Sequence, residues 1–548
     1  MNWFKKFNFS LLSGAAIFIA ALLSLPILVV LVNVVIGDGQ VWQHLYQTVL
    51  VEYVHNSLLL MVGVGIGVLC IGVPTAWLTS MCNFPGRQFL AWALLLPMAF
   101  PAYIIAYTYT GILDFAGPVQ TFIREMTGWR YGDYWFFEIR SLGGAMTMLI
   151  LVLYPYVYLM SRAAFLEQSA NTLEVARTLG YSNPQAFRKL ALPLARPAIV
   201  TGLTLALMET LADYGTVQYF SVNTFTTGIL RTFYGFGDVA AASQLAGVLL
   251  LFVTVLIVLE RYSRHRIRYH NSGIKKASSR RIPLGRWQGV CALLFCLLPI
   301  LLGFLIPALV LAYWAMFKAE FIADRFLQLA WNSFYLAALA ALILVSLALV
   351  LSYAGRLYKH KAVHASVGLS GLGYALPGTI IAIGTLVPLA WLDHQIIDLV
   401  KHYTGQKIGL LLSGTLFALL FAYTVRFMAV SLGAVQNGLG KIKPSMDMSA
   451  RTLGMNSWKV LTRIHLPLLK GSILTAILIV FVDVLKELPA TLVLRPFNFN
   501  TLAVRAFELA SDERLVDAAP ASLMIVLVSL VPVILLSRSI SSDVASSK

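Results

Sequence analysis

Two short stretches decide the fold: residues Thr172–Gly180 have the sequence TLEVARTLG, and residues Met446–Gly454 have the sequence MDMSARTLG. The pentapeptide ARTLG therefore occurs twice, 274 positions apart, in a chain of 548 residues. A single match of this length can arise by chance in a chain of biased composition. The flanking residues decide whether the two copies belong to a longer repeat.

The flanks keep the same register through most of each half. Ahead of the pentapeptide, Asn56-Ser57 matches Asn332-Ser333 and Pro101 matches Pro377, both at an offset of 276. Beyond it the offset is 274, and the matched positions are Leu192-Pro193 with Leu466-Pro467, Glu209 with Asp483, Asp213 with Glu487, and Arg231 with Arg505. A chance pentapeptide would not keep register on both sides. The halves are therefore predicted to be duplicates.

The composition places both halves in a membrane. Apolar residues make up 59% of the chain and charged residues 12%, and the mean hydropathy is +0.79, which excludes a water-soluble globule. The sequence contains twelve apolar runs that are long enough to span a membrane. Lipid offers the backbone no hydrogen-bond partner, so these runs are expected to be helices. They lie near 11–36, 57–81, 88–113, 141–165, 197–219 and 241–260, and again near 288–316, 332–355, 363–392, 408–432, 472–494 and 519–537. The predicted fold is an all-α integral membrane protein with about twelve spans in two tandem six-helix halves, related by a pseudo-twofold axis along the membrane normal.

The distribution of charge predicts the orientation. Residues 261–286 carry nine Lys or Arg and no Asp or Glu, so the positive-inside rule makes this linker cytoplasmic and puts both termini inside. The net charge of +17 is then a feature of topology and not of a nucleic-acid site. The predicted domains are residues 1–260 and 288–548, joined by the basic linker 261–287.

The repeated pentapeptide lies in a connection on this cytoplasmic side. The two loops are EVARTLGYSNPQAFRKLALP, residues 174–193, and MSARTLGMNSWKVLTRIHLP, residues 448–467. In each, a helical piece ends at a Gly, and a second piece ends at Leu-Pro thirteen residues later, which predicts a helix, a sharp turn and a helix. The alternative is an ordinary basic helix at the membrane surface.

This loop resembles the EAA motif of ABC importer permeases, in which Glu-Ala-Ala is followed at fixed spacing by Gly, Ile and Leu-Pro. The matching residues are Glu174, Ala176, Gly180, Leu192 and Pro193 in the first loop, and Ala450, Gly454, Ile464, Leu466 and Pro467 in the second. Met448 stands where the second Glu is expected and Asp447 precedes it, which leaves open whether the two loops are equal.

The resemblance implies a type I ABC importer transmembrane domain in a bacterial inner membrane, in which each loop docks on a separate ATPase. It implies two ATPase copies, which bind ATP and Mg, and a periplasmic substrate-binding protein. The chain itself has no G-x-x-x-x-G-K-[ST] motif and is expected to be no enzyme.

Two acidic residues in the fifth span of each half mark a candidate translocation path: Glu209 and Asp213 in ETLADYG, and Asp483 and Glu487 in DVLKELP. Spacing of i and i+4 puts each pair on one helix face. Two interpretations remain open. Lys486 pairs with Glu487 or Asp213 and merely holds helices together, or the carboxylates line a passage for a hard cation, with Asp213 and Glu487 as transient metal ligands.

The same segments resemble those of ferric iron permeases, on the sequences ETLADYGTVQYF (residues 209–220) and KELPATLVLRPFNFNTLAVR (residues 486–505). The resemblance implies ferric iron as the cargo, moved by alternating access. The acids speak against an anion but leave thiamine and polyamines as alternatives. A proton-coupled secondary transporter is the rival from another class, while a membrane enzyme has no supporting motif. Isolated histidines such as His465 are interpreted as residues of cytoplasmic connections.

Overall fold

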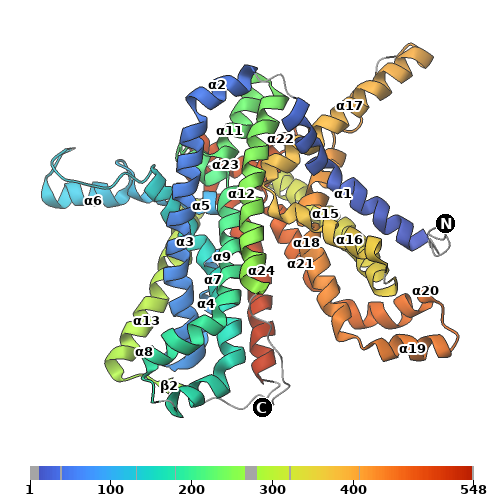
Figure 1. Cartoon of the computed structure of the whole chain (residues 1–548). Coiled ribbons are helices and arrows are strands. Elements are labelled where there is room, and N and C mark those ends of the chain that lie inside the picture. The colour runs from blue at the N-terminus through green and yellow to red at the C-terminus, as the bar shows by residue number, and fades with distance from the viewer. Residues whose placement is uncertain are drawn as a thin grey trace. The chain divides into compact units, whose positions relative to one another are not determined.

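The structure is a computed structural model that describes residues 11–36, 40–130, 132–178, 180–265, 281–319, 323–358, 360–406 and 408–545, most of them helical (Figure 1). Within this part of the chain, eleven helices are long and apolar enough to cross a membrane, or twelve if one bent pair counts as a span. The predicted all-α membrane fold is confirmed.

The helices follow the order of the predicted spans. Those of the first half are α1 (Leu11–Ile36), α2 (Gln40–Thr48), α3 (Leu50–Met81), α4 (Arg87–Ala93), α5 (Ala102–Leu113), α6 (Pro118–Thr127), α7 (Leu142–Thr178), α8 (Asn183–Ala186), α9 (Leu192–Ala212), α10 (Gly215–Tyr219), α11 (Phe225–Arg231) and α12 (Val239–His265). Those of the second are α13 (Arg286–Ile300), α14 (Ile306–Phe317), α15 (Ala323–Leu357), α16 (Lys361–Ser370), α17 (Gly378–Thr404), α18 (Leu416–Lys441), α19 (Pro444–Thr452), α20 (Ser457–Val460), α21 (Leu466–Leu485), α22 (Pro489–Leu494), α23 (Leu502–Ser511) and α24 (Leu515–Ala545).

Short irregular elements join them. The 3-10 turns are η1 (Leu96–Ala99) and η5 (Leu372–Ala375), and the π-helical segments are η2 (Phe187–Ala191), η3 (Thr232–Phe236), η4 (Leu301–Leu305) and η6 (Leu461–His465). Strands β1 (Cys82–Asn83) and β2 (Ile282–Pro283) form a small parallel pair.

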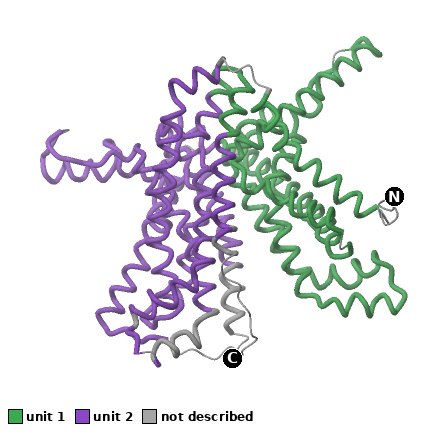
Figure 2. The backbone as a smooth tube through the Cα atoms, viewed as in Figure 1, with its two compact units in different colours: residues 1–39, 232–247, 323–504 green, residues 40–231, 248–322, 505–548 purple. Residues whose placement is uncertain are grey.

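The chain divides into two compact units that do not coincide with the sequence halves (Figure 2). Unit 1 comprises residues 1–39, 232–247 and 323–504, and unit 2 comprises residues 40–231, 248–322 and 505–548. The first span of each half has changed places: α1 packs on α15, α16 and α17 in unit 1, and α13 and α14 pack on α3, α4, α5 and α24 in unit 2. The boundary drawn at the basic linker stays a prediction about the duplication, and residues 266–280 of that linker lie outside the described residues.

Close backbone approach accompanies each exchanged span. A Cβ at Gly384 of α17 would collide with the carbonyl oxygen of Pro26 in α1. A Cβ at Gly303 in η4 would lie 2.9 Å from the carbonyl oxygen of Leu151 in α7. Small residues allow such approach between helices in lipid, where packing and not the hydrophobic effect drives association.

The outward faces of the spans are apolar. On α3, Leu58, Val62 and Ile66 recur every fourth residue and are 44%, 57% and 59% exposed. On α15, the buried positions are mostly small, with Ala337 and Ala348 fully enclosed. Large side chains toward the surroundings and small ones toward neighbouring helices are the pattern of a lipid-facing bundle.

The repeated prolines break the third span of each half. Pro101 is extended (φ −62°, ψ 140°) and Pro377 is extended (φ −53°, ψ 142°), so each ends one helical piece and precedes the next. In the first half the two pieces meet at 91°. The spans predicted at 88–113 and 363–392 are therefore not continuous helices, because proline lacks the N–H that would continue the helix.

The duplication is visible in hydrogen bonds within each unit. Asn56 donates its side-chain amide to the carbonyl oxygen of Asn223 at 2.9 Å, and its match Asn332 donates to the carbonyl oxygen of Asn500 at 3.2 Å. Each bond ties the second span of its half to the connection after the fifth. The sequence repeat is thus also a structural repeat.

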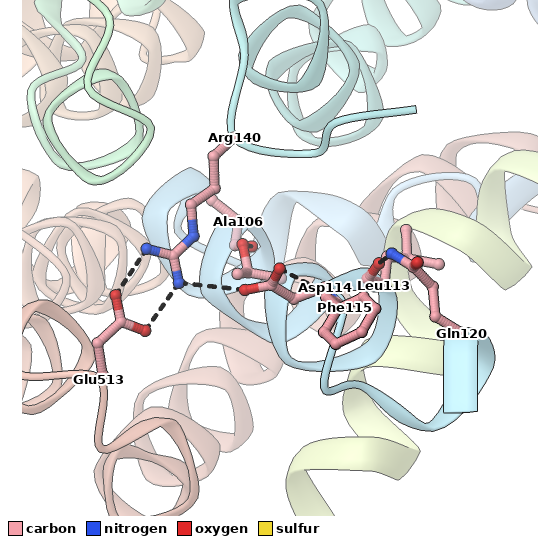
Figure 3. Close-up of polar contacts among 8 residues, drawn as sticks. Ala106, Leu113, Asp114, Phe115, Gln120, Arg140 and Glu513 are labelled. Carbon is pink, nitrogen blue, oxygen red and sulfur yellow. Dashed lines mark hydrogen bonds and ion pairs between the residues drawn. The ribbon is translucent and has the colours of Figure 1, made fainter. Parts of the chain in front are cut away.

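In unit 2, one arginine ties the connection before α7 to the connection before α24 (Figure 3). Arg140 lies between two acids: its Nη1 and Nη2 donate to Glu513 at 2.6 and 2.7 Å, and Nη2 lies 3.5 Å from Asp114 Oδ2. Glu513 follows α23 and has a left-handed backbone (φ 60°), a conformation that is unfavourable for any L-residue. In the first half, the left-handed residue that follows η3 is a glycine, Gly237, which adopts this conformation without strain. The bidentate pair explains why a glutamate stands there.

We predict that this pair contributes a coupling of about 0.5–1 kcal/mol to stability near neutral pH, a surface value because the Glu513 side chain is 60% exposed. Hydrogen bonds from Arg140 hold the pKa of Glu513 below its ordinary value, although partial burial opposes this. A carboxylate whose pKa is lower in the folded state stabilises the fold at pH values above its unfolded-state pKa of about 4.3. This stabilisation is lost as the pH falls from that value through the folded-state pKa.

The measurement is a double-mutant cycle of Arg140→Gln and Glu513→Gln on thermal unfolding of the detergent-solubilised chain, near neutral pH and near pH 4. A coupling that is absent at neutral pH, or equal at both pH values, contradicts the prediction.

Candidate functional site

The first EAA-like loop has the predicted helix, turn and helix. Helix α7 runs to Thr178, Gly180 follows with φ 71°, and α8 and the π-helical segment η2 lead into α9. Gly180 is exposed, and a Cβ there would have no atom within 4 Å. Glu174 and Ala176 belong to the last part of α7, where the side chains lie outside the described residues.

The second loop repeats this path in unit 1. Helix α19 is followed by Gly454 with φ 77°, then by α20 and the π-helical segment η6, which leads into α21. The turn is closed by backbone bonds from Gly454 to Arg451 and from Met455 to Ala450. Ala450 is buried against its neighbours, whereas Met448 is 64% exposed. A left-handed glycine thus ends the helix in both copies, as predicted.

Both loops join the next span through a π-helical turn, which was not predicted from the sequence. Leu192 N–H bonds to the carbonyl of Phe187, and Leu466 N–H bonds to that of Leu461, five residues back in each case. The following residue is Pro193 or Pro467, which has no N–H and whose ring crowds the preceding turn. Widening that turn relieves the clash, so the Leu-Pro of the motif encodes a bulge where loop meets span.

Asp447 is held by two side-chain partners within the protein and is not a free surface acid. Its Oδ2 accepts from Arg356 Nε at 2.8 Å and its Oδ1 lies 2.7 Å from Nε2 of His465, a residue that is fully buried in η6. Partial burial raises the pKa of Asp447, but the hydrogen bonds from Arg356 and His465 lower it more, so it stays below its ordinary value. The interpretation of His465 as a simple loop residue is wrong.

Arg356 also bonds to the end of α18. Its Nη1 donates to the carbonyl of Leu439 at 2.7 Å and its Nη2 to that of Ile442 at 3.0 Å. Tyr353, one turn earlier, donates to the carbonyl of Ser457 in α20. The second loop is therefore fixed to α15 and α18 by charge-assisted bonds.

The first loop is held differently, by aromatic packing. Phe187 of η2 lies 4.9 Å from the ring of Trp77 and 6.3 Å from that of Phe165, and the latter two are 5.4 Å apart. Trp77 occupies the sequence position that matches Tyr353. The described contacts of the first loop are thus aromatic, and those of the second loop are ionic and hydrogen-bonded.

Asp213 is a helix cap as well as an intramembrane acid. Helix α9 ends at Ala212, so Asp213 does not share a continuous helix with Glu209, which corrects the i and i+4 interpretation. Its Oδ1 accepts from the N–H groups of Thr216 and Val217 at 3.0 and 3.1 Å, and its Oδ2 accepts from Thr216 Oγ1 at 3.0 Å. These bonds start α10, because Gly215 is a poor helix former and the carboxylate supplies the missing acceptor.

Glu487 has the same part in unit 1. Helix α21 ends at Leu485, and the Glu487 carboxylate accepts from the N–H groups of Ala490 and Thr491 at 2.9 and 3.0 Å and from Thr491 Oγ1 at 2.6 Å. The bonds start α22, where Pro489 prevents continuation of α21. Glu487 is only 5% exposed.

A cation that the sequence analysis missed lies beside Glu487. Arg426 Nη1 and Glu487 Oε1 both lie 2.7 Å from the position that a Cβ on Gly378 would take. Gly378 follows the span-breaking Pro377, so the absence of a side chain there makes room for both groups. An arginine inside α18 was the available signal, because a charge within a span requires a partner or a function.

The remaining two acids are less constrained. Asp483 pairs with Lys486 at 3.0 Å, a partner other than the Glu487 or Asp213 that the sequence suggested for this lysine. Glu209 is half-buried on α9. Glu209 and Asp213 belong to unit 2, and Asp483 and Glu487 belong to unit 1.

The chain is similar in sequence to several known transport permeases. The Fe(3+)-transport system permease protein FbpB 2 of Haemophilus influenzae is 25% identical over 524 residues, which cover 94% of this chain and 96% of that protein. The ferric transport system permease protein FbpB of Actinobacillus pleuropneumoniae is 24% identical over 484 residues, 82% of this chain and 66% of that protein. The molybdenum transport system permease protein ModB of Haemophilus influenzae is 25% identical over 193 residues, only 35% of this chain and 81% of that protein.

A family model covers both halves. The model described as binding-protein-dependent transport system inner membrane component matches residues 5–269 and 352–541, which include both loops and all four acids. The chain belongs to the family of inner membrane components of binding-protein-dependent transport systems.

Proposed function

We propose that this chain is the permease subunit of an ATP-driven importer in a bacterial inner membrane, with both termini in the cytoplasm. A separate ATPase, in two copies that bind ATP and Mg, docks on the loops around Gly180 and Gly454. A periplasmic binding protein delivers the cargo to the outer face. Closure of the ATPase pair opens the permease outward, and hydrolysis returns it to the inward-open state.

The observation that carries this proposal is the pair of matching loops. Each presents an exposed, left-handed glycine between two helical pieces and joins the fifth span of its half through a π-helical turn. A displacement of either loop is therefore passed directly to the span that carries the acids. A proton-coupled secondary transporter gives no reason for this duplicated arrangement.

We propose ferric iron as the cargo, with thiamine or a polyamine as alternatives in the same class. Two relatives that cover at least four fifths of this chain are named for ferric transport, whereas the relative named for molybdenum covers about a third. Carboxylate oxygens suit a hard, highly charged cation.

Within the candidate path we propose Glu209, Asp213, Asp483 and Glu487 as its acids, with Asp213 as the principal transient ligand. Arg426 and the Glu487 carboxylate both approach Gly378, and Asp483 pairs with Lys486, so a cationic side chain already lies near each of these two acids. The buried hydroxyl of Tyr107 on α5, whose ring lies 6.5 Å from that of Tyr219 on α10, has no hydrogen-bond partner among the described residues.

The energy source is tested by uptake of radioactive iron into cells that express the complete system. We expect uptake to be abolished by vanadate and to survive an uncoupler, because ATP and not the proton gradient drives closure. Uptake that only the uncoupler abolishes would favour the secondary transporter. Vanadate-sensitive uptake of labelled thiamine or putrescine, with no iron uptake, would support the class and reject the cargo.

Coupling is tested by Gly180→Trp. The left-handed backbone strains any L-residue by about 1–2 kcal/mol, and the indole would project from an exposed turn into the proposed docking surface. We expect normal membrane insertion and loss of ATP-coupled uptake.

The matched control is Gly128→Trp in the same unit. Gly128 has φ 72° and likewise has no atom within 4 Å of a Cβ, but it lies on the connection between α6 and α7 that the charge pattern places outside. Equal uptake by the two variants would refute the coupling role of Gly180.

The passage and capping roles of Asp213 are separated by Asp213→Asn and Asp213→Ala. Asparagine still caps α10 but removes the charge, whereas alanine removes both. We expect Asp213→Asn to keep the thermal stability of the chain and to lose at least about tenfold in iron uptake, and Glu487→Gln to lose less. Full transport by Asp213→Asn would show that the carboxylate is only a cap.

A further inference from the structure

A cavity of about 420 Å³ lies wholly within unit 1, between α15, α16 and α18, at the ends of these helices next to the second loop. Its volume is in the range of about 300–1,000 Å³ that is typical of small-molecule sites. None of the acids discussed above borders it, so it is separate from the candidate path. From its lining we propose that it binds the phosphate group of an anionic phospholipid of the inner leaflet.

The polar lining is basic and neutral. Arg356, His364, Ser352 and Gln436 border the cavity, and no Asp or Glu is among its lining residues. Arg356 has five N–H donors, and three acceptors are recorded for it among the described residues: Asp447, Leu439 and Ile442. It also bonds the carbonyls of Leu439 and Ile442 at the end of α18, which offsets part of the negative charge of that helix terminus.

Ser352 supplies an independent observation. Its side chain is 5% exposed, and its Oγ has no hydrogen-bond partner among the described residues. A buried hydroxyl without a partner costs free energy, so a ligand oxygen in the cavity would relieve this cost. The hydroxyl and the guanidinium come from neighbouring turns of α15 and border the same space.

Glycines make the space. Gly368 of α16 and Gly440 of α18 border the cavity, and a Cβ at either would meet no atom within 4 Å. Val367 and Leu439 add an apolar part to the wall. A cavity with a basic end and an apolar wall at a helix end fits an amphipathic ligand, and basic pockets between spans on the cytoplasmic side favour anionic headgroups.

The assignment to the inner leaflet rests on the proposed orientation, but binding is measured without transport. The full-length chain in neutral detergent is titrated with phosphatidylglycerol or phosphatidylcholine and followed by native mass spectrometry. We expect phosphatidylglycerol to bind about fivefold more tightly for each basic side chain that it meets. Arg356 itself is left intact, because its removal would also free Asp447 and two carbonyls.

The decisive variant is Gly440→Leu, whose Cβ would meet no atom within 4 Å and whose side chain would occupy the cavity. Its control is Gly433→Leu on the same helix, where a Cβ also meets nothing within 4 Å but which does not line the cavity. Gly440→Leu is expected to abolish the preference for phosphatidylglycerol, Gly433→Leu to retain it, and the exposed His364→Gln to reduce it.

Inorganic phosphate distinguishes the two sources of the anion. If millimolar phosphate raises the unfolding temperature of the wild type but not of Gly440→Leu, while the two lipids bind alike, the phosphate chemistry stands and the ligand is soluble rather than lipid. If neither phosphatidylglycerol nor phosphate distinguishes the wild type from Gly440→Leu, the site does not exist. Failure of iron uptake alone would bear on the proposed function and not on this site.

Discussion

The structure depends on one constraint: inside lipid, a backbone N–H or carbonyl that leaves a helix must find a partner within the protein. The spans obey it by being helical, and each departure from helicity comes with a specific compensation. At Pro101 and Pro377 the departure uses a residue that has no N–H to satisfy. At the ends of α9 and α21 it uses the carboxylates of Asp213 and Glu487 as acceptors for the first N–H groups of the next helix.

The same constraint explains why the duplicated halves retain particular residues and differ elsewhere. Residues that compensate a break occur in both copies, with Asp in one and Glu in the other, and Pro193 and Pro467 each follow a π-helical turn. The surroundings of the loops carry no such requirement and have diverged. One loop is held by the rings of Trp77, Phe165 and Phe187, and the other by the bonds of Asp447.

Much of the fold follows from the sequence, because the period and length of apolar runs determine spans directly. The two loops with their left-handed glycines are equally predictable, since Gly and Leu-Pro act locally. The exchange of first spans is not predictable in this way, because α1 and α14 are apolar all round and nothing in their own pattern selects a partner. The close contact between Gly384 and Pro26 appears only once the helices are packed.

The sequence identifies the acids of the fifth spans as candidates, but it does not show their helical setting. Spacing of i and i+4 suggests one helix face, but Asp-Tyr-Gly and Glu-Leu-Pro are also signals for the start of a new helix, and these local signals prevail over the span. His465 and Arg426 were missed in the same way, because the acids that lie near them, Asp447 and Glu487, are 18 and 61 positions away in the chain. A buried charge is recognised by its partner, and a single sequence does not show that partner.

Capping also limits what the carboxylates can do for a passing cation. A carboxylate that accepts three hydrogen bonds has few lone pairs left, so it can attract a cation without forming a full coordination shell. Conduction requires such weak binding, since a cargo held by a complete set of ligands would not leave. Asp213 meets this condition, with three recorded donors and no recorded cation partner among the described residues. Glu487 does not meet it, because Arg426 lies beside its carboxylate. The two matched acids therefore have unequal parts, and the asymmetry already seen in the loops extends to the breaks of the fifth spans.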